Sequence, residues 1–190
     1  MYQKYQTEAI VLHSRERGES DRVYALYTRD FGLVRARASA VRAERSLMRY
    51  ALQHYSLANL SLVRGKRGWR IAGTGAIRCG VGDARAIAAL ARLSHLVLKL
   101  IAGEERNAYL FAALSEAHSA LTIGRCDAFG TIEIVCAARI LYSLGYISNE
   151  ALRTALFTHT AYTGESLLEA ETMKDKLLSS INNAIAQTQL

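Results

Sequence analysis

The chain has 190 residues, of which 51% are hydrophobic and 22% charged, so it can pack one large or two small domains rather than remain disordered. Its longest apolar runs fall far short of the roughly 18 residues of a membrane-spanning helix, and its first residues do not resemble a signal peptide, so we expect a cytoplasmic protein without membrane contact. The net charge of +7 is divided unevenly: residues 1–80 hold 15 Lys and Arg against 6 Asp and Glu, whereas residues 81–190 hold 9 against 11. This asymmetry indicates an anionic partner for the first part of the chain.

Short apolar runs and two-residue alternation predict five strands in the first part of the chain. The strands cover residues 8–14, 22–28, 33–38, 55–62 and 69–72. Turn residues at 30–32 and at 65–68 separate neighbouring strands. Five short strands fit a small closed barrel better than an open sheet with unprotected edges.

Helical periodicity begins after Gly82 and continues to the end of the chain. Asp83 is suited to cap the first helix, and Gly103, Gly124 and Gly145 are suited to end the first three. The apolar stripes lie at Ile87–Ile101, Leu110–Leu121, Ile132–Leu144 and Leu177–Ile185, with a short helix near Glu150–Leu156. The sequence therefore predicts two domains, residues 1–80 and residues 81–190, and an α+β chain in which a β-barrel precedes an all-α domain.

Two clusters of basic residues are the strongest functional signal. Arg35 and Arg37 alternate with apolar neighbours, which places both on the outer face of their strand. The predicted nucleic-acid-binding residues are Arg35, Arg37, Arg42, Arg45, Arg49, Arg64, Lys66, Arg67, Trp69 and Arg70. Guanidinium groups suit phosphate, and Trp69 or a nearby tyrosine is suited to stack on a base. The alternative is a solvated basic surface with Trp69 in the core.

Other side chains give no pattern for a cofactor, a metal or catalysis. Cys79, Cys126 and Cys136 lack the spacing of a zinc site, so we interpret them as small buried residues and expect neither metal nor cofactor. Glu19 and Asp21 lie two apart, as carboxylates of a metal-dependent nuclease could, but local turn and capping chemistry is the preferred interpretation. No nucleophile–base set is present, so we expect a binding protein rather than an enzyme.

Several segments resemble the RecO family of DNA repair proteins. The most specific are Gly18–Val23 and Thr28–Gly32, preceded by Glu8–Leu12. Weaker matches are Ala51–His54, Leu100–Glu105 and Leu144–Tyr146. The chain departs from the family in two ways: it has no proline, so His54 stands where a turn-forming proline is usual, and it lacks the four-cysteine zinc site of many members.

This resemblance implies an oligonucleotide-binding (OB) fold followed by a helical domain. It implies binding to single- and double-stranded DNA, annealing of complementary strands and help in loading recombinase onto DNA coated by single-strand binding protein. It also implies two protein partners, RecR and the acidic C-terminal tail of single-strand binding protein, and association with the nucleoid during repair.

By the same resemblance, the tail should bind the helical domain. Arg139 is the candidate cation there, beside apolar Ile140, on the helix that leads into Leu144–Tyr146. Two alternatives to a recombination mediator stay open: another OB-type protein that binds RNA or the ribosome, and an enzyme that acts on nucleic acid.

Overall fold

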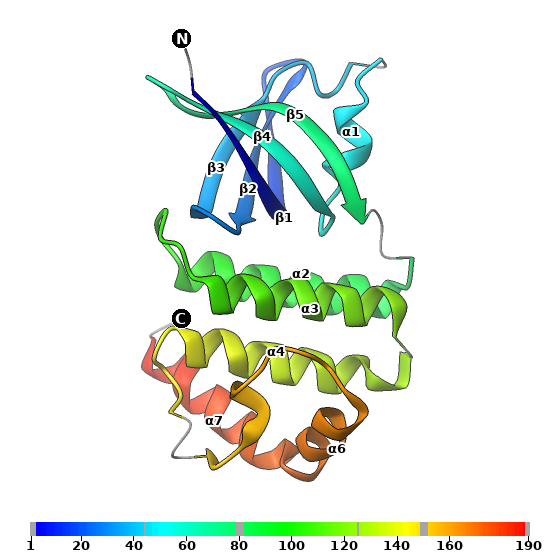
Figure 1. The fold of residues 1–190 in the computed structure, drawn as a ribbon, viewed down its shortest axis with the longest axis vertical. Helices are drawn as coiled ribbons and strands as arrows, with labels where there is room; N and C mark the ends of the chain where they lie inside the picture. The colour runs from blue at the N-terminus through cyan, green and yellow to red at the C-terminus, as the bar shows by residue number, and fades with distance from the viewer. Residues whose placement is uncertain (1–2, 44, 79–81, 125, 149–151, 189–190) are drawn as a thin grey trace. The chain divides into compact units, whose positions relative to one another are not determined.

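A computed structural model describes residues 3–43, 45–78, 82–124, 126–148 and 152–188. The chain divides into two compact units, one formed by Met1–Val81 with Ile101–Ala108 and the other by Gly82–Leu100 with Tyr109–Leu190. The first is a β-barrel and the second is helical, which confirms the predicted α+β class (Figure 1). None of the described helices is both long enough and apolar enough to cross a membrane.

Five strands close into a barrel in the order β1-β2-β3-β5-β4, with β1 paired again to β4. Their bounds are Lys4–Arg17 (β1), Asp21–Thr28 (β2), Gly32–Ala38 (β3), Leu57–Gly65 (β4) and Gly68–Arg78 (β5). A short helix α1, Met48–Ala51, follows β3 and precedes β4 along the chain (Figure 1). β1 is longer than predicted because it pairs with two strands: Lys4–Ile10 face β4 and Ala9–Arg17 face β2. All pairs are antiparallel except β3 with β5. This is the topology of an OB fold.

Alternation along the strands separates the barrel core from its surface. On β3, Val34, Ala36 and Ala38 are fully buried, while Arg35 between them is exposed. The core also takes buried apolar residues from the other four strands, among them Val11, Leu26, Leu60, Leu62 and Ile71. The same alternation places Arg35 and Arg37 of β3 on the outer face of the barrel.

The segment Ile101–Ala108 joins the barrel unit although the sequence pattern assigned it to the helical part. Trp69 Nε1 donates a hydrogen bond to Glu104 Oε1 over 2.9 Å. Gly32, at φ +67°, lies so close to the main chain of Glu105 that a Cβ would collide with its carbonyl group. A glycine is required here both for the backbone conformation and for the space. α2 ends at Leu100, and these contacts attach the segment that follows it to the barrel.

The helical unit is organised around one central helix. Its elements are α2 (Ala84–Leu100), α3 (Ala108–Ile123), η1 (Cys126–Ala128), α4 (Phe129–Ser143), η2 (Ala155–Phe157), α6 (Gly164–Thr172) and α7 (Lys174–Gln187). α4 packs against α2, α6 and α7, and its Val135, Ala138 and Leu141 form a core with buried residues of α6 and α7. Leu177 and Ile181 are buried there, as the predicted stripe requires.

Helix ends follow the predicted chemistry in part. Asp83 caps α2, since its Oδ1 accepts a hydrogen bond from the Arg85 N–H over 2.7 Å. The short helix predicted near 150–156 is only partly visible: residues 149–151 lie outside the described residues, and the 3₁₀ turn η2 follows at Ala155–Phe157. Thr154 caps η2 by accepting from the Leu156 N–H.

Candidate nucleic-acid interface

The two basic clusters meet on the barrel at Arg37 and Arg70, which are 33 positions apart in sequence. β3 and β5 run parallel, and their register makes Arg37 and Arg70 direct partners. Each of these arginines has a buried residue directly before it and directly after it. Because side chains alternate between the two faces of a strand, both arginines lie on the outer face of the barrel. Neighbouring strands are about 4.8 Å apart, so two positive charges lie side by side here.

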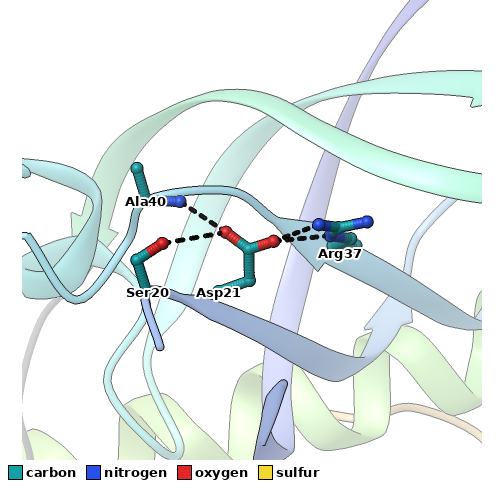
Figure 2. Close-up of polar contacts among 4 residues, drawn as sticks. All are labelled: Ser20, Asp21, Arg37 and Ala40. Carbon is teal, nitrogen blue, oxygen red and sulfur yellow. Dashed lines mark hydrogen bonds and ion pairs between the residues drawn. The ribbon is translucent and has the colours of Figure 1, made fainter. Parts of the chain in front are cut away.

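Arg37 is held by Asp21, at the start of β2 (Figure 2). Arg37 Nε donates to Asp21 Oδ2 over 2.8 Å, and its Nη2 donates to the same oxygen. The Ala40 N–H donates to Asp21 Oδ1 over 2.8 Å, and the Ser20 hydroxyl contacts the same oxygen at 3.5 Å. The Ala40 N–H and the Arg37 guanidinium lower the pKa of Asp21 below its ordinary value of 3.8. Asp21 therefore serves local structure, as the capping interpretation of this carboxylate predicted.

The Asp21 contacts also fix the loop that carries the rest of the first cluster. Ala40 adopts a left-handed backbone conformation with φ +52°, and the Arg42 N–H donates to the Ser20 carbonyl over 3.1 Å. Val41 is buried in the barrel core. The backbone of Arg42 is therefore fixed by these contacts. Arg45 lies further along the loop, at an exposed position.

Ion pairing divides the predicted DNA-binding residues into two groups. Arg37 pairs with Asp21, Arg42 with Glu16, and Arg64 with Glu104. Within the described ranges of the chain, no ion pair involves the other group, which comprises Arg35, Arg45, Arg49, Lys66, Arg67 and Arg70. Lys66 and Arg67 form the exposed two-residue turn between β4 and β5. Residues of the second group can contact an anion without the loss of an internal ion pair.

The structure corrects the assignment of Trp69 as a base-stacking residue. Its side chain is only 4% exposed and packs against Tyr5 and Phe31, with ring centroids 5.5 and 5.1 Å away. Arg64 covers it from outside, with Cζ 5.3 Å from the ring centroid. Trp69 belongs to the barrel core because its indole N–H finds an acceptor in Glu104.

An exposed aromatic residue in the basic loop is better placed for stacking. Tyr50 on α1 is 54% exposed, and the Arg49 guanidinium lies 4.7 Å from its ring centroid. Arg49 also donates to the Tyr50 hydroxyl over 2.6 Å. Leu47, 82% exposed, adds apolar surface to the same loop. The sequence offered one signal for Tyr50, its place directly after the first basic cluster.

The assignment of Arg139 and Ile140 as a partner-binding pair is also wrong. Both are 0% exposed. Arg139 donates to the carbonyl oxygens of Leu156, Thr160 and Ala161 over 2.9, 2.7 and 3.3 Å, and its guanidinium lies 4.7 Å from the Tyr162 ring centroid. It fastens the irregular segment after η2 to α4. A charged helix residue next to an apolar one suggests a surface site. Here the segment that includes Leu156, Thr160 and Ala161 covers Arg139.

Among the residues that the structure describes, the cysteine and carboxylate side chains form no separate site. Cys136 is fully buried on α4, as predicted, and burial raises the pKa of its thiol to about 12, so it stays protonated at neutral pH. Cys79 lies outside the described residues. In the part of the chain that the structure describes, no three His, Cys, Asp or Glu side chains gather as a metal site.

Comparison with known proteins supports the resemblance. Residues 1–71 match the family model described as "Recombination protein O N terminal". The chain is 40% identical over 62 residues to DNA repair protein RecO of Desulfitobacterium hafniense, which covers 33% of this chain and 23% of that protein. It is 30% identical over 144 residues to DNA repair protein RecO of Rubrobacter xylanophilus, which covers 75% of this chain and 58% of that protein.

The chain thus spans less than two thirds of the length of either relative. The family match coincides with the barrel and its basic surface, and the longer alignment is twice the length of that match, so it extends beyond the barrel strands. On these grounds the chain belongs to the RecO family of DNA repair and recombination proteins.

Proposed function

We propose that this protein is a recombination mediator that binds single- and double-stranded DNA through the basic surface of its barrel. The observation that carries the proposal is the parallel β3–β5 register, which joins two basic clusters at Arg37 and Arg70. The same unit carries seven further predicted basic residues, five without an ion pair among the described residues and two, Arg42 and Arg64, with an exposed one. The relatives named DNA repair protein RecO support DNA rather than RNA as the nucleic acid.

Strand annealing follows from this surface by charge neutralisation. Two complementary strands repel each other, and a cationic surface that holds both lowers their repulsion without covalent chemistry. The barrel part of the chain has a surplus of positive charge, 15 basic against 6 acidic residues in positions 1–80. We further propose that the protein assists recombinase loading on DNA coated by single-strand binding protein, with RecR as a second partner.

Annealing of fluorescent complementary oligonucleotides tests the proposal. Wild-type protein should accelerate pairing, and it should still do so when both strands are coated with single-strand binding protein. A variant with Arg35→Ala and Arg70→Ala should anneal more slowly at equal protein concentration. Equal acceleration of duplex RNA formation, with no annealing of coated DNA, would favour the alternative of an RNA-binding protein.

A pocket of about 250 Å³ in the helical unit replaces Arg139 as the proposed site for the tail of single-strand binding protein. Its apolar walls come from Leu93 and Leu96 on α2, Ala137 on α4 and Ile185 on α7. Arg92, His95 and Lys99 stand at its edge. Arg92 is held by Glu133 through two hydrogen bonds of 2.5 and 2.7 Å, whereas His95 and Lys99 are exposed. An acidic and apolar peptide matches this combination.

Charge reversal at the pocket edge distinguishes peptide binding in this pocket from nonspecific electrostatic attraction to a basic protein. Lys99→Glu should weaken binding of a peptide with the sequence of the tail, and Lys176→Glu at an exposed position of α7 should not, although both change the net charge equally. Fluorescence anisotropy of a labelled peptide measures both. Equal binding by the two variants would remove the pocket from the proposal.

A further inference from the structure

A pocket of about 230 Å³ lies on the barrel unit, lined by Arg22, Tyr24, Val41, Arg42 and Arg49. Its three arginines come from three separate segments: β2, the loop after β3, and α1. We propose that this pocket binds one phosphate group of a nucleic acid, and that Glu16 holds its arginines in the free protein as an internal competitor for the phosphate. The inference rests on the proposed function, because DNA supplies the phosphate.

Glu16 bridges two of the three arginines. Its Oε1 lies 3.3 Å from Arg22 Nη2, and its Oε2 lies 3.2 Å from Arg42 Nη1. A carboxylate that gives one oxygen to each guanidinium engages the same donors that two oxygens of a phosphate would engage. One negative charge faces three positive charges, so the pocket keeps a positive surplus. Glu16 is 56% exposed and lies on the outer end of β1, so it is free to turn into solvent.

The walls of the pocket are fixed before any ligand arrives. Tyr24 is 1% exposed and Val41 also 1%, so both belong to the barrel core. The Ala40 N–H donates to Asp21 (Figure 2), and the Arg42 N–H donates to the Ser20 carbonyl, so the loop is tied to the start of β2. Burial raises the pKa of the Tyr24 hydroxyl, so it remains a neutral donor at neutral pH. A preformed site loses less conformational entropy when it binds.

Arg22 shows that the arginines are not fully satisfied by Glu16. Its Nε–H is buried and donates to no acceptor among the described residues. An unsatisfied buried donor costs free energy, and a small rotation of the guanidinium toward a phosphate would relieve it. Lys66 and Arg67, in contrast, project from an open turn, where they add charge but no enclosed site.

Removal of the Glu16 charge tests the proposal directly. Glu16→Gln should bind a labelled single-stranded oligonucleotide about twofold to fivefold more tightly, because an exposed ion pair no longer has to break. The log–log salt slope should steepen by up to about 0.7, the value of one phosphate contact on a single strand. In an Arg22→Gln/Arg42→Gln background, the same change should have no effect on affinity.

Glu8→Gln is the matched control, since Glu8 pairs with Arg29 near the other end of β1, roughly 26 Å away along the strand. It removes the same charge and should leave the affinity nearly unchanged. Equal gains from Glu16→Gln and Glu8→Gln, or a gain that persists without Arg22 and Arg42, would overturn the pocket. Melting temperatures confirm that each variant is folded.

Two oligonucleotides of one sequence, with and without a 5′ phosphate, identify the source of the phosphate group. If the phosphorylated strand binds more tightly to Glu16→Gln, the pocket takes strand ends; equal binding of the two strands assigns an internal phosphodiester. If wild-type protein binds no DNA, the proposed function fails together with the pocket. If wild-type protein binds and Arg35→Ala/Arg70→Ala weakens binding, but Glu16→Gln changes nothing, only the pocket fails.

Discussion

The barrel unit and the helical unit use arginine in opposite ways. On the barrel, Arg35 and Arg70 are exposed, and Arg37 beside them is held at the surface by Asp21. In the helical unit, Arg139 is fully buried and donates to three main-chain carbonyl oxygens. The comparison shows that charge counts identify the region of the chain with a surplus of positive charge, whereas only the surroundings of each arginine decide its role. The predictions below test this difference, from the largest expected effect to the smallest.

Replacement of Arg139 should destabilise the helical unit. Arg139→Met keeps much of the side-chain volume but leaves one buried and two partly buried carbonyl groups without their donor. We expect a loss of about 3–5 kcal/mol in the free energy of unfolding, as for the removal of one partner from a buried charged network. Urea denaturation measures it. Lys176→Met, at an exposed position of α7, is the control and should stay within about 0.5 kcal/mol of wild type. A stable Arg139→Met protein would contradict a structural role.

The aromatic residues should separate binding from stability on the barrel. Tyr50→Ala should cost about 1–3 kcal/mol in binding to single-stranded DNA, the usual contribution of a stacked base, and much less for duplex DNA. Its stability should barely change, because Tyr50 is 54% exposed. Trp69→Phe should lower the stability of the barrel and leave the affinity for DNA nearly unchanged, because the variant loses the hydrogen bond to Glu104 inside the core. An unchanged affinity of Tyr50→Ala for single-stranded DNA would show that Tyr50 does not stack on a base.

Asp21 should link stability to pH. Its folded pKa is lowered, chiefly by the Ala40 N–H and by Arg37, so the ionised form favours the folded state. The contribution is complete above the ordinary carboxyl pKa of 3.8 and is lost as the pH falls through the lower folded value. Asp21→Asn should therefore melt below wild type at pH 7, and the difference should shrink below about pH 3.8. A difference that stays constant down to about pH 3 would show that the charge of Asp21 is not the cause.

Much of the fold could be predicted from the sequence because local patterns determine it. Alternation at Leu33–Ala38 gave both the strand and its outer arginines, and Asp83 marked the start of α2. Non-local contacts could not be predicted in this way. The acceptor of Trp69 is 35 residues away, and the carbonyl groups that bind Arg139 lie 17 to 22 residues away in an irregular segment.

The sequence predicted the positive charge of the candidate site, but not which of its side chains lie together or form ion pairs. The basic clusters were evident, yet their meeting at Arg37 and Arg70 depends on a parallel register that no local pattern encodes. Arg22 was missed because it lies outside both clusters in sequence. Its place beside Arg42 depends on Glu16 and on the loop anchored at Asp21.

The salt dependence of DNA binding by an Arg35→Ala/Arg70→Ala variant tests the central claim most directly. These two arginines have no ion-pair partner among the described residues, so their removal should not disturb folding. We expect weaker binding to every sequence tested and a log–log salt slope flatter by about 1.4, two single-strand phosphate contacts. Lys174→Ala/Lys176→Ala removes the same charge from α7 and should leave the slope unchanged. Equal slopes for wild type and the arginine variant, in a protein that melts normally, would place the DNA elsewhere.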